Sequence, residues 1–201
     1  MIEQFEEILE SQLEQAGLGF LGADARKALA TYCAELDRWN QKLNLTGLSG
    51  ASLVQRLVVE PVWIGVALKI SGVLTDVGSG NGSPGVPIAI ARQLGSVQFV
   101  EPRIRRAAFI RNVLQRLRIV GGVEQGRLED VTANLQPANW YTFQGLVPSQ
   151  SIVKALPQGH ITTNVVWITT NDSELSHLPE PTLVTVPFTK TRVKVFSLDQ
   201  S

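Results

Sequence analysis

The stretch Val73-Leu-Thr-Asp-Val-Gly-Ser-Gly-Asn-Gly-Ser-Pro-Gly-Val-Pro87 decides the fold of this chain. A short apolar run ends at Asp76, then Gly78, Gly80 and Gly82 alternate with other residues, and an apolar segment follows. This order predicts a strand, a tight turn and a helix, because glycine accepts positive φ and leaves main-chain N–H groups open to a ligand. The start of the helix favours an anionic group through its unpaired N–H donors.

An acidic residue follows where a nucleotide site needs one. Glu101 comes directly after the next apolar run, about 20 residues beyond the glycine turn, where a strand–helix–strand unit binds a ribose hydroxyl pair. The pattern is Gly-x-Gly-x-Gly, not the dinucleotide Gly-x-Gly-x-x-Gly, and no Tyr-x-x-x-Lys is present, which argues against a nicotinamide dehydrogenase. Two alternatives stay open: a turn that holds no ligand, and an ion pair between Glu101 and Arg105 or Arg106.

Composition predicts one globular α/β unit. The chain has 201 residues, of which 44% are apolar, and no run of about 18 apolar residues is present to cross a membrane. The acidic, amphipathic N-terminus fits neither a secretory nor a mitochondrial leader. The single cysteine, Cys33, indicates a reducing compartment, so we expect a cytoplasmic protein. With His160 and His177 as the two histidines, a Cys/His zinc site has too few ligands, and we expect no metal.

Hydrophobic periodicity divides the chain into a helical N-terminal segment, residues 1–50, and an α/β unit, residues 51–201. Helices are expected over 2–16, 24–40 with Asp24 as N-cap, and 51–69, where Pro61 can kink or divide the helix. The following ranges alternate: strands at 73–77, 97–101, 122–125 and 139–143, and helices at 85–94, 103–119 and 149–156. Such alternation is typical of a mainly parallel sheet with helices on both faces. The late apolar runs at 164–170, 182–186 and 192–197 lack helices between them and predict an antiparallel edge.

Arginines gather on the helix expected from residue 103. Its predicted buried stripe consists of Ile104, Ala107, Ile110, Leu114 and Leu117. Arg105 and Arg116 then project from the opposite side, and Arg106 flanks the stripe. Arginine binds phosphate in a bidentate manner and stacks on bases, so these side chains are candidates for contact with RNA. Charge alone equally supports a solvated helix face with ion pairs to neighbours.

Four linked motifs resemble those of the small-subunit (16S) ribosomal RNA guanine-N7 methyltransferases, also called glucose-inhibited division protein B. The motifs are Trp39-Asn-x-Lys-x-Asn-Leu-Thr46, Asp76-Val-Gly-Ser-Gly-x-Gly-x-Pro-Gly-x-Pro87, Glu101-x-x-x-Arg-Arg-Ala-x-Phe109 and Arg127-x-Glu129. Their order and spacing match over roughly residues 30 to 130. The resemblance implies a Rossmann-like domain that binds S-adenosylmethionine and carries a helical N-terminal extension.

The resemblance also implies roles for individual residues. The glycine-turn residues would line the methionine and ribose part of the cofactor: Asp76, Gly78, Gly80, Gly82 and Ser83. Glu101 would hold the ribose hydroxyls, and Leu128 and Glu129 would lie beside the adenine. The basic residues assigned to RNA are Arg56, Arg105, Arg106 and Arg116.

The cofactor part of the chain matches the family, whereas the substrate part departs from the family pattern. Where the family has Arg-His followed by Asp-Ser, this chain has Arg56-Leu57 and Glu60-Pro61. Gln144 stands where the family has an active-site arginine, and Trp167-Ile-Thr-Thr-Asn171 replaces a Leu-Lys-Gly type motif. Gln144 is therefore the candidate positioning residue, and restoring an arginine there is expected to raise the rate.

The expected chemistry asks little of side chains. Guanine N7 carries an in-plane lone pair and no proton, so the family reaction needs alignment and desolvation more than a general base. The leading hypothesis is methylation of guanine N7 in small-subunit ribosomal RNA, free or in an assembling subunit, by a monomeric protein. The alternatives are a non-catalytic relative that binds S-adenosylmethionine or RNA, and a methyltransferase for a small molecule.

Overall fold

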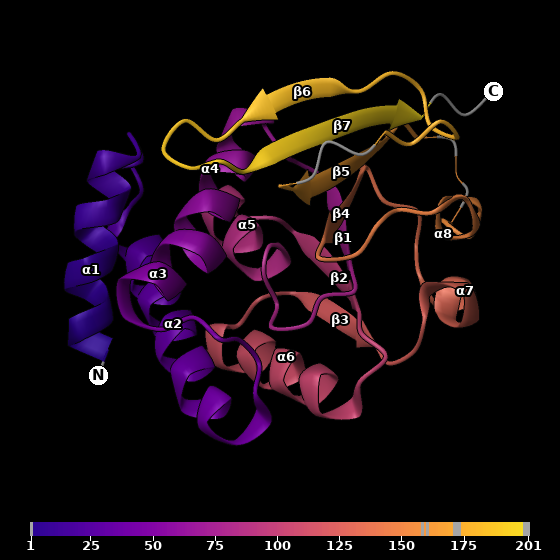
Figure 1. Ribbon diagram of the computed structural model, residues 1–201. Coiled ribbons are helices and arrows are strands. Elements are labelled where there is room, and N and C mark those ends of the chain that lie inside the picture. Colours follow the sequence, from indigo (N-terminus) through magenta and orange to yellow (C-terminus); the bar gives the residue numbers. More distant parts are fainter. Residues whose placement is uncertain (1, 158, 160, 171–173, 199–201) are drawn as a thin grey trace.

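The sheet has seven strands in the order β3-β2-β1-β4-β5-β7-β6 (Figure 1). The computed structural model describes residues 2–157, 159, 161–170 and 174–198. The strands are β1 (Val73–Val77), β2 (Ser96–Val100), β3 (Gly121–Glu124), β4 (Trp140–Gln144), β5 (Thr163–Thr169), β6 (Thr182–Thr185) and β7 (Arg192–Leu198). β1 to β5 run parallel, and β7 is antiparallel to both β5 and β6. The α/β class and the antiparallel edge are confirmed, and the carboxyl ends of the parallel strands all reach one edge of the sheet.

Helices cover both faces of the sheet, but unequally. One face is covered by α4 (Glu60–Ala67), α5 (Gly85–Arg92) and α6 (Ile104–Leu117), which share a large apolar core with β1 and β2. The other face carries α7 (Leu128–Val131), a 3₁₀ turn (Thr132–Asn134) and α8 (Gln150–Lys154). Neither α7 nor the 3₁₀ turn was expected, because both are too short to show a helical period.

The N-terminal helices lie outside the layer formed by α4, α5 and α6. They are α1 (Ile2–Gln15), α2 (Ala23–Leu43) and α3 (Gly50–Val54). Phe5, Leu9 and Leu13 of α1 are buried in the same apolar cluster as β1 and β2. The prediction that Asp24 is the N-cap of α2 is wrong. The backbone is extended at Gly22, which is the N-cap, so Asp24 already lies in the first helical turn.

The expected division of the third helix occurs one turn before Pro61. A π-helical turn, η1 (Gln55–Val59), separates α3 from α4, and the Glu60 N–H donates to the Gln55 carbonyl five residues earlier. Proline has no N–H and its ring crowds the preceding turn, so the regular i→i−4 ladder cannot run through this point. Arg56 lies in this wide turn, and Glu60 is the residue that directly follows it.

The buried stripe of α6 is also shifted from its predicted position. Ile104 is 65% exposed, whereas Ala107, Phe109, Ile110, Val113 and Leu114 are buried. Ile104 is the first residue of the helix and lies beyond the reach of the packed face. No helix in the described part of the chain is both long enough and apolar enough to cross a membrane.

Candidate active site

The glycine turn connects β1 to α5 as predicted. Gly78, Gly80 and Gly82 have φ values of 73°, 55° and 86°. These are left-handed conformations that glycine adopts without a steric penalty. The Gly78 and Ser79 N–H groups both donate to the Val100 carbonyl, at 2.9 and 3.1 Å. The turn is thereby fixed against the end of β2.

Glu101 holds the turn from the other side. Its side chain is buried, with Oε2 accepting from the Gly80 N–H and Oε1 from the Arg103 N–H, both at 2.8 Å. Among the described residues it forms no ion pair with Arg105 or Arg106, so that alternative is not what the structure contains. Each carboxylate oxygen has a further lone pair, so the group can still accept from a ligand hydroxyl.

Asp76 joins three elements beneath the turn. Its Oδ1 accepts from the Thr142 hydroxyl of β4 at 2.8 Å, and its Oδ2 accepts from the Gly85 N–H of α5 at 3.3 Å. Burial raises the pKa of Asp76 from 3.8 to about 7, although both hydrogen bonds act to lower it. A Cβ on Gly85 would lie 2.6 Å from the Phe99 ring, so helix and strand are in close contact here.

A cleft of about 390 Å³ lies beside the turn, at the carboxyl ends of β1 and β2. Four of the predicted cofactor residues line it: Gly78, Glu101, Leu128 and Glu129. The volume suits a small-molecule ligand. The buried carboxylate at one side and the apolar Leu128 fit a ligand with a hydroxyl pair and a flat ring, as an adenosine has. Arg103 and Arg106 also line the cleft, so Arg106, which was assigned to RNA, lies at the cofactor end of the site.

The remaining glycine-turn residues are not among those that line this cleft. The Gly80 N–H is used by Glu101, and a Cβ on Gly82 would approach Val86 and the Tyr32 ring of α2. The Ser83 hydroxyl donates to Gln144 Oε1 at 3.4 Å. Direct contact of Asp76, Gly80, Gly82 or Ser83 with a cofactor stays a prediction.

A second cavity, of about 270 Å³, adjoins the cleft. Both are lined by Gly145 and Leu146, which follow β4. The second cavity is also lined by Arg56, Gln144, Trp167 and Thr191. Among the described residues its lining includes no carboxylate, imidazole or thiol. A larger hollow, of about 700 Å³, lies between residues 174–181 and β6–β7, but no residue of the glycine turn or of β4 reaches it.

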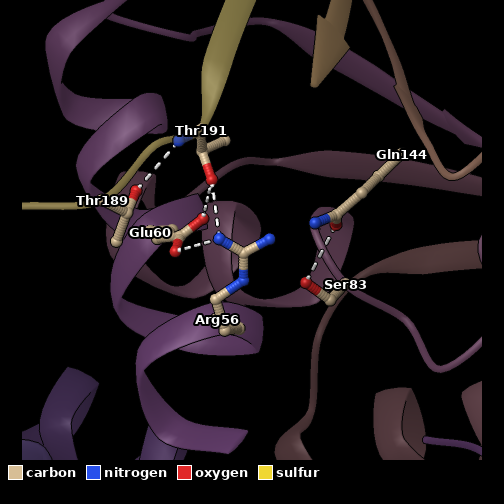
Figure 2. Close-up of polar contacts among 6 residues, drawn as sticks. All are labelled: Arg56, Glu60, Ser83, Gln144, Thr189 and Thr191. Atoms are coloured by element: carbon tan, nitrogen blue, oxygen red, sulfur yellow. Dashed lines mark hydrogen bonds and ion pairs between the residues drawn. The ribbon is translucent and has the colours of Figure 1, made fainter. Parts of the chain in front are cut away.

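Arg56 is held in the second cavity by two partners (Figure 2). Its Nη1 donates to Glu60 Oε1 at 3.0 Å and to Thr191 Oγ1 at 2.9 Å. The Thr191 hydroxyl in turn donates to Glu60 Oε2 at 2.7 Å. Burial raises the pKa of Glu60, against the lowering effects of the Thr191 hydrogen bond and the Arg56 charge. The sequence offered no signal for Thr191, because it lies in a loop far along the chain from both partners.

The arginines of α6 differ in their surroundings. Arg116 Nε pairs with Glu35 Oε1 of α2 at 3.0 Å, the alternative that charge left open. Arg111 donates to the Val123 carbonyl at 3.0 Å. Arg105 is exposed. Arg105 therefore stands as the better candidate for contact with a phosphate.

The other polar candidates have structural roles. His177 Nε2 lies 2.8 Å from the Pro148 carbonyl, and His160 lies outside the described residues. Cys33 is buried, which raises the pKa of its thiol to about 12 and makes the thiolate unavailable at neutral pH. In the part of the chain that the structure describes, no group of three or more His, Cys, Asp or Glu side chains could hold a metal ion.

Comparisons with known proteins agree with this geometry. The model of the family described as GidB, rRNA small subunit methyltransferase G, matches residues 25–169. Ribosomal RNA small subunit methyltransferase G of Anaeromyxobacter dehalogenans is 38% identical over 114 residues, which cover 56% of this chain and 53% of that protein. The match thus spans about half the length of that curated relative.

Solved structures share the fold. The precorrin-6y C5,15-methyltransferase of Geobacter metallireducens has a TM-score of 0.53 at 14% identity, covering 73% of this chain and 92% of that one. TrmK of M. capricolum, solved with S-adenosyl-homocysteine, has a TM-score of 0.52 at 9% identity, covering 70% and 68%. The Rossmann-like methyltransferase fold expected from the sequence is therefore confirmed.

Proposed function

We propose a function for this chain, which belongs to the rRNA small subunit methyltransferase G family: it transfers a methyl group from S-adenosylmethionine to guanine N7 of small-subunit ribosomal RNA. The observation that carries the proposal is the junction of the two cavities. The cleft beside Glu101 suits a nucleoside, and it meets the cavity of Arg56 and Gln144 at Gly145 and Leu146. A methyl donor in the first and a base in the second would meet at this junction.

The residues of the cleft fit S-adenosylmethionine by type. When bound, this cofactor supplies a methyl group already activated by its sulfonium charge. Glu101 would accept hydrogen bonds from the ribose hydroxyls while Gly80 and Arg103 keep its carboxylate in place. Leu128 would cover the adenine ring on the apolar side of the cleft.

The second cavity supports N7 as the acceptor. Methylation of a hydroxyl or of an exocyclic amine requires a proton to leave, and a general base would then be expected within hydrogen-bond reach. The described lining of this cavity offers amide, hydroxyl and guanidinium groups, none of which is a base at neutral pH. N7 has a free lone pair and no proton, so alignment against the methyl group suffices.

The surface around the cleft supports a nucleic-acid substrate. Arg103, Arg106 and Arg127 line the cleft, and Arg105 is exposed in the first turn of α6. Guanidinium groups bind phosphates and stack on unpaired bases. We infer small-subunit ribosomal RNA, free or in an assembling subunit, as the partner and the cytoplasm as the compartment.

The test uses the whole chain, labelled S-adenosylmethionine and small-subunit ribosomal RNA that lacks its methyl groups. We expect labelled 7-methylguanosine after nuclease digestion, at a single mapped nucleotide. Calorimetry with S-adenosyl-homocysteine runs in parallel. Binding without transfer to free RNA or to isolated subunits would show a non-catalytic relative. No heat of binding would overturn the cofactor assignment itself.

A further inference from the structure

The guanidinium of Arg56 is only partly used by the protein. Both of its hydrogen bonds are donated by Nη1, one to Glu60 and one to Thr191. Nε and the second terminal nitrogen have no hydrogen-bond partner among the described residues, and the side chain is 39% exposed. In Figure 2 the second terminal nitrogen points toward the side chains of Gln144 and Ser83. Free donors thus enter the cavity that adjoins the cofactor cleft.

We propose that Arg56 binds the target purine itself, by donating a hydrogen bond to the carbonyl oxygen O6 of guanine. Glu60 and Thr191 are positioning residues that aim the guanidinium, and Gln144 offers a neutral donor beside it. This assignment rests on the proposed function, and it narrows the RNA contact that the sequence suggested for Arg56 to the target base. The end of β4 carries a neutral residue, and the cation enters the same cavity from the π-helical turn instead.

The ion pair argues for a base and against a phosphate. Glu60 is 1% exposed and lies 3.0 Å from Arg56, so a phosphate that approached Arg56 would also meet the carboxylate charge. A carbonyl oxygen carries no net charge and needs only a directed donor.

The charge balance of the reaction favours a neutralised arginine. The N7 lone pair forms the new N–C bond as the carbon–sulfur bond breaks, the bonding electrons stay on sulfur, and no proton moves. The purine ring gains a positive charge, which an unpaired guanidinium at O6 would oppose. Because Glu60 offsets the charge of Arg56, the pair presents N–H donors to the ring with little net field. Glu60 is therefore part of the function of Arg56 as well as of its geometry.

The experiment combines enzyme variants with base analogues at the mapped target nucleotide. Guanosine is compared with 2-aminopurine riboside, which keeps N7 and lacks O6, and with inosine, which keeps both and lacks the 2-amino group. Arg56→Gln should lower kcat/KM on guanosine and inosine by at least ~10-fold, the loss of one charge-assisted hydrogen bond. On 2-aminopurine riboside the same variant should lose less than ~2-fold, because the contact is already missing.

Three further measurements separate binding from folding. Arg56→Gln/Glu60→Gln leaves no buried unpaired carboxylate, so it controls for instability in the single variant. Arg56→Lys keeps the charge without the fork and should still lose at least ~5-fold on guanosine. Thr191→Val should reduce the preference for guanosine over 2-aminopurine riboside, which a merely structural role would leave intact. Affinity for S-adenosyl-homocysteine should stay unchanged in all three variants.

The outcomes distinguish this inference from the proposed function. If the wild type methylates RNA and Arg56→Gln loses equally on guanosine and 2-aminopurine riboside, the contact with O6 is wrong. If Arg56→Lys matches the wild type and Arg56→Gln mainly flattens the salt dependence of RNA binding, Arg56 binds a phosphate. If the wild type transfers no methyl group to any small-subunit RNA, the proposed function fails and takes this assignment with it.

Discussion

The two halves of the site treat their polar groups in opposite ways. In the half built from β1, β2 and the glycine turn, acceptors are satisfied by the protein: Asp76 binds Thr142 and Gly85, and Glu101 binds Gly80 and Arg103. In the half built from η1, β4 and the β6–β7 loop, Arg56 and Gln144 keep donors directed into a cavity. The first arrangement forms a rigid cradle before any ligand arrives, and the second waits for an acceptor. A shared fold therefore preserves the cradle, while the residues that meet the substrate can change.

The largest expected effect comes from titrating Asp76, which tests whether the glycine-turn half of the site holds its carboxylate buried. Its pKa is about 7 in the folded chain against 3.8 for the free group, so the native state binds a proton that the unfolded state has released between these values. The free energy of unfolding should fall as pH rises from about 4 to 7, by an amount on the order of 4 kcal/mol. Asp76→Asn should remove this fall, measured by urea unfolding across that range.

Thr142→Val provides the matched control for Asp76. It removes a hydrogen bond that lowers the pKa, so the fall in stability should extend above pH 7. Parallel pH profiles for the wild type and Asp76→Asn would mean that Asp76 is not the titrating group.

The cradle itself is tested by Glu101→Ala. This change removes the acceptor of two backbone N–H groups and the expected partner of the ribose hydroxyls. Affinity for S-adenosylmethionine should drop by ~100-fold in calorimetry. Glu129 lines the same cleft with an exposed side chain, so Glu129→Ala should reduce the affinity for S-adenosylmethionine by no more than ~3-fold. Equal losses in the two variants would contradict the role given to Glu101.

Gln144→Arg sharpens the comparison in the other half. Sequence alone predicts that restoring the family arginine raises kcat/KM. The cavity predicts the reverse, because a second guanidinium would face Arg56 where Glu60 offsets only one positive charge. We expect kcat/KM to fall by ~3- to 10-fold in methyl-transfer assays, with S-adenosylmethionine affinity unchanged. A rise in rate would show that Arg56 does not supply the cation of this cavity.

The smallest expected effect concerns the outer surface of α6. Arg105→Ala should reduce the slope of log K against log salt for RNA binding by about 0.7 to 1, the value for one phosphate contact. Arg116→Ala should change the slope by less than half of that, because Glu35 already neutralises Arg116. A slope that is the same in Arg105→Ala and the wild type would identify a solvated helix face.

The two halves also differ in how far sequence could predict them. Asp76, the glycines and Glu101 lie within 26 residues, and each has a local reason for its type: a strand end, a positive φ, an acid after the next strand. The second cavity is lined by Arg56, Gln144 and Thr191, which the fold brings together from separate elements, and Glu60 binds both Arg56 and Thr191. Nothing in the sequence around Thr191 indicated that its hydroxyl would bind Arg56 and Glu60. The sequence also did not show that Arg116 would pair with Glu35. Helix periodicity predicts on which face of α6 a side chain lies, but it does not predict which element packs beside that face.

The π-helical turn at Gln55–Val59 sets a register between two parts of the molecule. Such a turn holds one residue more than an α-helical turn, so side chains before it are rotated by about 100° relative to those after it. Leu53 and Val54 pack into the apolar cluster that holds α1 and α2, whereas Ile64 of α4 packs against residues of β5 and β7. Deleting a single residue here would restore a regular helix. The N-terminal helices would then be rotated about the axis of that helix and would lose their present packing against the rest of the molecule. The extra residue in this turn therefore sets the rotation of the Arg56 side chain relative to the strands that form the cavity.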